Sequence, residues 1–222
     1  MYVKFDKGID GYRYLVMFDL ASKVTGVCLW NIGKDRPERT DIIKVGGTHE
    51  PPTVGLYRQL ELYFGGLEKE ISLKDILVSK EAMPIQAGKF TTIQTLVSLA
   101  KSHAILELFL YQHGIDSYDG VGVYPASTRA YFKHICPLPD GRHEEKTDIN
   151  AYVVGKYGLP PTSLDESDAV FLAETLIHSK WNRDIDEEIR EVKRHRKTLK
   201  AAHAIAACDD RISALSKMKT GF

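Results

Sequence analysis

Four carboxylates in this sequence have the type and setting that a metal-dependent reaction on a phosphodiester requires. Asp19 closes one apolar run, Glu81 closes another, and Asp165 and Asp168 lie three residues apart in a helical pattern. If such like charges gather, they repel and raise one another's pKa, so the cluster needs cations. Ligands that are all oxygen select hard metals, Mg²⁺ above all, with Mn²⁺ able to substitute. Two such ions about 3.5 to 4 Å apart can activate a water and stabilise the leaving oxygen, which suits cleavage of nucleic acid.

Three of these acids also have a simpler interpretation. Asp19 opens a polar turn, where an aspartate commonly hydrogen-bonds its own backbone. Asp165 and Asp168 fall in the first turns of a helix, where acids complement the helix dipole, and that is sufficient for Glu166. The helix dipole does not explain why Asp165 and Asp168 flank the line of residues that packs on the sheet. The case for a shared site therefore depends on the elements that would bring all four together.

Two of the acids follow strands that the chain would set side by side. Apolar runs at 14–18 and 27–30 flank a polar turn, and a third strand is predicted over 41–45, which gives three antiparallel strands. A fourth strand, 76–78, follows an amphipathic helix predicted over 54–71. A strand, a crossover helix and a strand favour a parallel, right-handed arrangement that brings the fourth strand beside the first. The acids that follow these two strands would then share one end of the sheet.

The order of strand and helix patterns predicts an α/β protein with a mixed five-stranded sheet flanked by helices. The remaining elements are a helix over 92–113, a fifth strand over 121–124, a helix over 129–134 capped by Ser127 or Thr128, a helix over 147–157, and a helix that begins at Ser163. A spacing of three puts Asp165 and Asp168 on one face of the last helix. This topology would gather all four acids at a single sheet end.

The helix predicted over 92–113 has more apolar surface than one face resting on a sheet requires. Its apolar residues form one stripe and continue beyond it at Leu99, Leu106, Phe109 and Leu110. The surplus has two interpretations, which are contact with another subunit and burial of the helix within one chain.

Composition restricts the class of protein more than its chemistry. Hydrophobic residues make up 43% of the 222 residues and charged residues 27%, as in ordinary globular chains. Thirty basic residues balance thirty acidic ones, so a polyanion would be attracted only by local positive charge. The three cysteines have no metal-ligand spacing, and we find no signal pattern and no apolar run of roughly 20 residues. We expect a soluble, cytoplasmic protein without membrane contact.

The composition changes after Trp181. We expect a folded domain over 1–180 and a charged helical extension over 181–222, first acidic and then basic. A helix there would carry a basic stripe able to bind DNA arms, formed by Arg190, Lys193, Arg194 and Lys197. The alternatives are support of a dimer, or a solvated helix on which these bases pair with Glu187, Glu188 and Glu191.

Five segments together resemble the RuvC-like Holliday junction resolvases of the RNase H-like superfamily, in the same order and at similar spacing. They are FDLASKVTG at 18–26, VSKEAMP at 78–84, VYPASTRAYF at 123–132, EKTDINAYVVGKYGLPP at 145–161 and DESDAVFLAETLIH at 165–178. The resemblance covers roughly 14–178. It implies a crossover junction endodeoxyribonuclease that cleaves branched DNA, Holliday junctions in particular, with two Mg²⁺ per active site. The corresponding roles are DNA recombination, DNA repair or phage DNA processing.

The same resemblance assigns roles to residues. Asp19, Glu81, Asp165 and Asp168 would be the catalytic metal ligands, and Lys146 would contact the junction or the scissile phosphate. The family also implies a homodimer joined through the helix after Glu81, with one active site per junction strand. Besides the four bases of the extension, the residues predicted to contact DNA are Lys23, Lys89, Arg129, Lys133 and Lys146.

The sequence departs from the family in three places. The Asp-Pro-Gly turn is Asp19-Leu20-Ala21 here, the loop after Glu81 differs in length, and the extension past Trp181 is long. A divergent branch is indicated, and if it is of phage origin the site of action is the host cytoplasm.

Two other functions are compatible with parts of the sequence. One is a non-catalytic binder of branched DNA with the same fold, which the four retained acids disfavour. The other is an ATPase of the sugar-kinase or actin-like type, which would need a second similar domain and Gly-rich loops. The choice among four-way junctions, flaps and forks is open from the sequence.

Overall fold

The computed structural model describes residues 9–21, 23–45, 50–83, 92–118, 122–136, 145–159, 163–198 and 202–220. The chain divides into two compact units, Met1–Thr175 and Leu176–Phe222. The first unit is an α/β domain, and the described residues of the second are helical.

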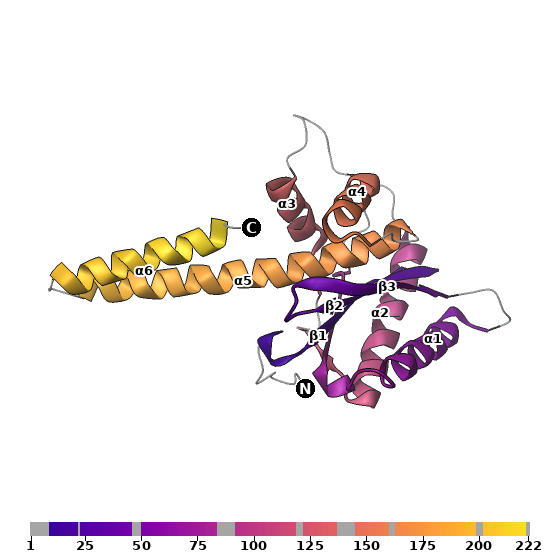
Figure 1. Cartoon of the computed structure of the whole chain (residues 1–222). Helices are drawn as coiled ribbons and strands as arrows, with labels where there is room; N and C mark the ends of the chain where they lie inside the picture. The colour runs from indigo at the N-terminus through magenta and orange to yellow at the C-terminus, as the bar shows by residue number, and fades with distance from the viewer. Residues whose placement is uncertain are drawn as a thin grey trace. The chain divides into compact units, whose positions relative to one another are not determined.

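The first unit is built on a mixed sheet with the strand order β3-β2-β1-β4-β5 (Figure 1). Its strands are β1 (Tyr14–Asp19), β2 (Val24–Asn31), β3 (Arg36–Lys44), β4 (Ile76–Lys80) and β5 (Asp116–Ser117). The β1–β2 and β2–β3 pairs are antiparallel, whereas β1–β4 and β4–β5 are parallel. The predicted sheet, three antiparallel strands followed by two parallel ones, is confirmed.

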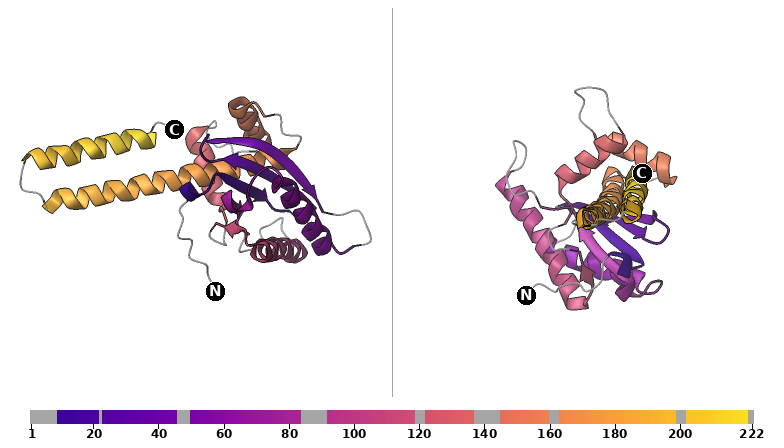
Figure 2. Two further views of the ribbon diagram at one scale, coloured as in Figure 1. Left: turned by 60° about the horizontal axis from the view of Figure 1, so that its bottom comes forward. Right: turned by 90° about the vertical axis from the view of Figure 1, so that its left-hand side faces the viewer.

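Helices cover both faces of this sheet (Figures 1 and 2). On one face lie α1 (Pro52–Leu67) and α2 (Ile93–His113), and on the other lie α3 (Pro125–Ile135), α4 (Lys146–Tyr157) and the first part of α5 (Leu164–Thr198). Side chains alternate along a strand, so the buried β1 residues Val16 and Phe18 join the core under α1 and α2, while Leu15 and Met17 face the other layer.

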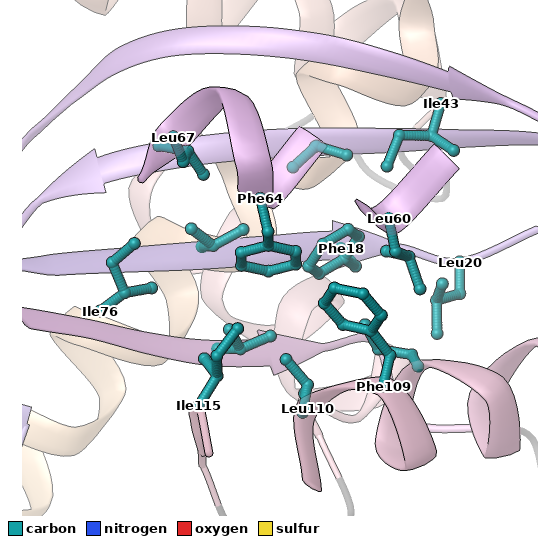
Figure 3. Packing of buried hydrophobic residues seen from close by; sticks show 14 of the residues in the cluster. Phe18, Leu20, Ile43, Leu60, Phe64, Leu67, Ile76, Phe109, Leu110 and Ile115 are labelled. Atoms are coloured by element: carbon teal, nitrogen blue, oxygen red, sulfur yellow. The ribbon is translucent and has the colours of Figure 1, made fainter. Parts of the chain in front are cut away.

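The core between the sheet, α1 and α2 is rich in aromatic rings (Figure 3). The Phe64 ring of α1 stacks on the Phe109 ring of α2 with centroids 5.3 Å apart, and Phe18 of β1 lies 6.2 Å from Phe64. Burying such a side chain fully contributes about 1.5–3 kcal/mol. This core fixes the strand ends on which the candidate site is built.

The second unit contains the rest of α5, from Leu176, and α6 (Ala202–Thr220). The Arg196 guanidinium of α5 makes two contacts with the Asp209 carboxylate of α6, Nε to Oδ1 at 2.6 Å and a terminal nitrogen to Oδ2 at 3.1 Å. This bidentate pair joins the two helical segments.

The structure corrects two expectations. The fifth strand is Asp116–Ser117 and not 121–124; within the described part of 121–124, Val123 makes only an isolated bridge to Glu81. The helix predicted over 129–134 begins at Pro125, because proline is well suited to the first helical position. Ser127 and Thr128 therefore lie inside α3 and do not cap it.

Among the described residues, α2 is the one helix long and apolar enough to cross a membrane by length and composition. Such a signal is weak when it comes from a single helix. In this fold the α2 residues Leu106, Phe109 and Leu110 pack in the core of the first unit, so we assign the helix to that core.

Candidate metal centre

Asp19 and Glu81 stand at the ends of neighbouring parallel strands. The register pairs Phe18 with Lys80, and the Glu81 N–H donates to the Phe18 carbonyl at 3.0 Å. Because side chains alternate along a strand, Asp19 and Glu81 share the face that α5 covers. Lys80 faces the other side, where its ammonium pairs with Glu107 of α2. The two acids therefore leave the sheet at its carboxyl edge, where open α/β sheets commonly bind ligands.

The first turn of α5 holds the other two acids. Ser163 Oγ accepts a hydrogen bond from the Glu166 N–H (3.3 Å), and Glu166 Oε2 accepts one from the Ser163 N–H (2.7 Å). This reciprocal capping box fixes the start of the helix at the predicted cap residue. Glu166 Oε1 also accepts a hydrogen bond from Thr40 of β3 at 2.9 Å. The turn that carries Asp165 and Asp168 is thus attached to the sheet.

All four acids are brought to one place. Carboxylate oxygens of Asp19, Asp165 and Asp168 lie within 4.8 Å of one another. Glu81 and two of these acids line a cavity of about 230 Å³. The full lining is Asp19, Glu81, Pro125, Thr128, Arg129, Glu145, Lys146, Ile149, Asp168, Phe171 and Leu172. A donor set made of carboxylate oxygens fits a hard divalent cation such as Mg²⁺ or Mn²⁺.

The electrostatics of the cluster follow from burial and mutual repulsion. Burial, then Glu81, Asp168 and Asp165, raise the pKa of Asp19 to about 8, against the opposing effect of Lys146. Burial followed by Asp168 raises the pKa of Glu81, and burial raises that of Asp168 despite its hydrogen bond with Lys146. Positive charge at this site would therefore be strongly stabilised.

Lys146, the first residue of α4, supplies a cation to the cluster. Its ammonium lies 2.9 Å from Asp165 Oδ1 and 2.6 Å from Asp168 Oδ2. Burial lowers the pKa of Lys146, but the hydrogen bonds with Asp168 and Asp165 outweigh this effect and raise it above its ordinary value. Arg129 of α3 lines the same cavity and, like Lys146, opposes the rise in the pKa of Glu81. Arg129 of α3 and Lys146 of α4 thus give the cavity a positively charged side next to the acids, which we call the cationic wall.

The other residues predicted to contact DNA are less closely grouped. Lys23 and Lys133 are exposed in the first unit, and Lys193 and Arg194 are exposed in the second. Arg190 and Lys197 lie in α5, whose side chains the structure does not describe at those positions, and Lys89 is outside the described residues. Their role in binding remains a prediction.

One group behind the site was not anticipated from the sequence. The carboxylate of Glu174 in α5 is fully buried and accepts hydrogen bonds from Tyr131 (2.9 Å), Tyr152 (2.7 Å), Lys156 (2.9 Å) and Tyr157 (2.8 Å). Burial, together with Glu174, raises the pKa of all three tyrosines. We call these five residues the Glu174 cluster. It joins α3 and α4 to the helix that carries two of the acids. A charged residue inside the apolar run AVFLAETLI was the available signal, because a buried carboxylate needs partners.

A third contact between α4 and α5 lies between the acids and the Glu174 cluster. Ser167 Oγ donates to Asn150 Oδ1 at 2.7 Å. Nearby, the Tyr157 ring of α4 packs edge-on against the buried Trp30 ring of β2, with centroids 5.4 Å apart.

Comparison with known proteins supports the fold at low sequence identity. No known family matches the sequence. Nor does any curated protein. Among solved structures, the chain resembles RuvC of Thermus thermophilus in complex with a Holliday junction substrate, with a TM-score of 0.53, 13% identity, and coverage of 76% of this chain and 96% of that one. A second Thermus thermophilus RuvC structure matches with a TM-score of 0.53 and 13% identity, and the match covers 75% of this chain and 95% of that one. The yeast mitochondrial Holliday junction resolvase Ydc2 matches with a TM-score of 0.46 and 12% identity, and the match covers 76% of this chain and 81% of that one.

The strand order and the helical layers define an RNase H-like α/β fold. More particularly, the chain has the fold of the RuvC-type Holliday junction resolvases.

Proposed function

We propose that this protein is a divalent-metal-dependent endonuclease that cleaves branched DNA, four-way junctions above all. The observation that carries the proposal is the convergence of Asp19, Asp165 and Asp168, with carboxylate oxygens within 4.8 Å of one another, in a cavity that Glu81 also lines. A cluster of repelling carboxylates has no use in a protein that only binds phosphates. The RuvC-type fold, seen in a complex with a Holliday junction substrate, supports the class of DNA.

The acidic and basic residues of the site would have different roles in cleavage. The four acids would hold two Mg²⁺, with Mn²⁺ as a substitute, and the bound metal would supply an activated water and stabilise the leaving oxygen. Asp19 must lose its proton to act as a ligand, and its raised pKa makes this step dependent on pH. Lys146 and Arg129, which face the acids across the cavity, would neutralise the scissile phosphate and orient it.

The partners proposed are branched DNA and a second copy of this chain. Dimerisation through α2 would give one active site for each of two junction strands, so that incisions are paired. Cleavage of this kind serves DNA recombination, repair or phage DNA processing in the cytoplasm.

The basic residues of the second unit are proposed as contacts to DNA arms. Lys193 and Arg194 are exposed on α5, in agreement with such a role. Neutralising Arg190, Lys193, Arg194 and Lys197 should weaken junction binding and flatten its salt dependence, by up to about one unit of slope per lost phosphate contact.

The decisive experiment compares the cleavage of labelled four-way, three-way and linear duplex DNA by the purified protein in Mg²⁺ or Mn²⁺. We expect cleavage of the four-way junction in preference to linear duplex, and none in EDTA. Asp19→Asn should abolish cleavage and leave junction binding intact or tighter, because a ligand is lost together with a charge that repels phosphate.

Two outcomes would contradict the proposal. Junction binding without cleavage by the wild type in either metal would indicate a non-catalytic DNA-binding protein. Full cleavage by Asp19→Asn would remove that residue from the metal site, and Glu81→Gln, Asp165→Asn and Asp168→Asn test the other ligands in the same way.

A further inference from the structure

Gly26 lies where the backbone of α5 touches the sheet. It is buried in β2 and pairs with Asp19 across the β1–β2 ladder. A Cβ at Gly26 would lie 2.0 Å from the Asp165 carbonyl oxygen and 2.4 Å from its carbonyl carbon, a separation that real Cβ atoms essentially never show. The first turn of α5 therefore rests directly on the backbone of β2, and any side chain at this position would push it away.

Gly122 has the same relation to the other strand that carries an acid. A Cβ there would lie 2.3 Å from the Lys80 carbonyl oxygen and 3.1 Å from the Glu81 carbonyl carbon. Its φ of +89° is a second reason for glycine, because other residues rarely adopt that conformation. The next residue, Val123, exchanges two backbone hydrogen bonds with this segment, from its N–H to Lys80 and to its carbonyl from Ala82, each 2.8 Å long.

Among the glycines for which the structure describes the surroundings, these two are distinct. At Gly33 the nearest atom to an added Cβ would be a side-chain oxygen 3.7 Å away, at Gly55 a methyl 4.0 Å away, and at Gly65, Gly66, Gly114, Gly155 and Gly158 nothing lies within 4 Å. Both close approaches fall on the backbone of a predicted ligand or of its neighbour, Asp165 in one case and Lys80–Glu81 in the other. A close glycine–backbone contact is thus found next to a predicted metal ligand at two places, at Asp165 in α5 and at Glu81 after β4.

We propose that Gly26 and Gly122 are positioning residues that set the spacing of the carboxylates and thereby their preference for Mg²⁺. The inference rests on the proposed metal-dependent function. To accept a methyl group at Gly26, the start of α5 must retreat by roughly 1 Å, since real Cβ contacts stay beyond 3.0 Å. Asp165 and Asp168 would retreat with it while Asp19 stays on β1. A methyl group at Gly122 would displace Glu81 instead.

The size of that displacement decides which cation is affected. Mg²⁺ requires near-ideal octahedral geometry with oxygens at about 2.0–2.1 Å, whereas Ca²⁺ accepts flexible geometry at about 2.3–2.6 Å. A site in which one side retreats by up to about 1 Å therefore loses Mg²⁺ more than Ca²⁺, because the longer and more flexible Ca²⁺–oxygen contacts accommodate part of the change. General destabilisation of the fold would weaken both cations alike.

The test is calorimetric titration of the full-length wild type, Gly26→Ala and Gly122→Ala with Mg²⁺ and, separately, with Ca²⁺, without DNA. Gly33→Ala is the matched control, because its methyl group would make only an ordinary van der Waals contact, 3.7 Å from Asn31 Oδ1. We expect each of the two variants to lose roughly 10- to 100-fold in Mg²⁺ affinity, the range typical when the support of a metal ligand is lost, with a smaller loss for Ca²⁺. The control should match the wild type.

Other outcomes separate this inference from the proposed function. Wild-type Mg²⁺ affinity in folded Gly26→Ala and Gly122→Ala, or equal losses for both cations, overturns the inference and leaves the nuclease proposal standing. A wild type that binds neither cation, with or without DNA, overturns both. If one variant does not fold, the other carries the test, since the two act on different acids; if neither folds, the glycines are structural and the inference is rejected.

Discussion

Asp19 joins the chemistry of the site to the stability of the fold. Its carboxyl group lies between Glu81 on the next strand and the acids of α5, and burial together with these neighbours raises its pKa to about 8 from an ordinary value of 3.8. The folded protein therefore retains a proton on this group under conditions in which the unfolded chain has released it. Between these two values a rise in pH favours the unfolded chain. The four acids of the candidate metal centre thus destabilise the folded protein, and bound cations would reduce this effect.

This leads to a prediction for the protein in EDTA. The wild type should lose thermal stability as the pH rises from about 6.5 to about 8, because the folded protein retains on Asp19 a proton that the unfolded chain has already released. Below that range His103 opposes the trend, since burial and Lys80 lower its pKa to about 4 and its folded form gains stability as the pH rises towards 6.5. Asp19→Asn should flatten the profile between pH 6.5 and 8. Calorimetric Tm values for both proteins check this.

Saturating Mg²⁺ supplies the complementary measurement. It should raise the Tm of the wild type, and more at pH 8 than at pH 6, because proton and cation compete for the same carboxylates. A wild-type Tm that climbs steadily from pH 6.5 to 8 in EDTA would contradict the raised pKa.

Single residues also show how far sequence reasoning extends at this scale. Asp19 and Glu81 could be placed because each ends an apolar run, and the period-two rule for strands requires no tertiary information. Glu174 could not be matched to its partners, since its four donors come from two other helices. Nothing in the local pattern of α5 identifies which tyrosines meet it. Gly26 was assigned to the polar turn before the second strand, but it lies in β2, and its contact with Asp165 depends on where α5 crosses the sheet.

At the scale of elements, α4 is attached to α5 at three points along its length. Lys146 contacts Asp165 and Asp168 at its start, Asn150 accepts a hydrogen bond from Ser167, and the Glu174 cluster holds its end. The first contact involves the acids themselves, whereas the Glu174 cluster lies behind the cavity, where its Tyr131 and Tyr152 rings pack on the cavity residue Phe171. The cluster therefore fixes α4, and with it the cationic wall, by contacts that are independent of DNA.

Glu174→Ala should accordingly be severely destabilising. It leaves the hydroxyls of three tyrosines and the Lys156 ammonium without their acceptor, and breaking a buried charged network from one side costs about 3–5 kcal/mol. Lys156→Met should cost clearly less, because Glu174 keeps its three tyrosine hydroxyl donors and the lost ion pair involves a lysine that is 39% exposed. Denaturant unfolding measures both, with Glu61→Ala on the exposed side of α1 as the control. Equal losses for Glu174→Ala and the control would show that the cluster contributes nothing to stability.

The fifth strand was placed wrongly from the sequence because its position depends on a neighbouring strand. The segment 121–124 alternates apolar residues and glycine, yet the strand that pairs with β4 is the polar pair Asp116 and Ser117. The position of the fifth strand was determined by its pairing with β4 and not by the local strand propensity of the sequence. The long periodic helices were predictable because their apolar stripes span many turns, and the helix over 92–113 was placed correctly, with Thr92 as its cap.

At the scale of the whole molecule, α2 presents a second apolar side that the described residues of the chain do not cover. The large exposed residues there are Ile93, Val97, Leu108 and Tyr111, of which Ile93 and Tyr111 are 77% and 83% exposed. Of the two interpretations that the sequence left open, burial within one chain does not account for this side. Docking of a second copy would cover it, as the proposed function requires.

We expect the wild type to sediment as a dimer at micromolar concentration. Val97→Glu combined with Leu108→Glu should give a folded monomer that no longer makes paired incisions, since a two-fold interface repeats each charge on both subunits. Leu62→Glu, at a large exposed apolar residue of α1, is the matched control and should remain dimeric. A monomeric wild type would refute dimerisation through α2.

The contact between Trp30 and Tyr157 gives the protein an optical probe of its own. The sequence contains two tryptophans, so Trp181→Phe leaves Trp30 as the only indole. Trp30 is buried under the α4 residue Tyr157, and its fluorescence should be blue-shifted as long as water is kept from the ring. If α4 moves when a junction enters the cavity, the emission shifts to longer wavelength; if α4 is rigid, the spectrum is unchanged. The time course of helix movement could thus be followed in solution, without an added label.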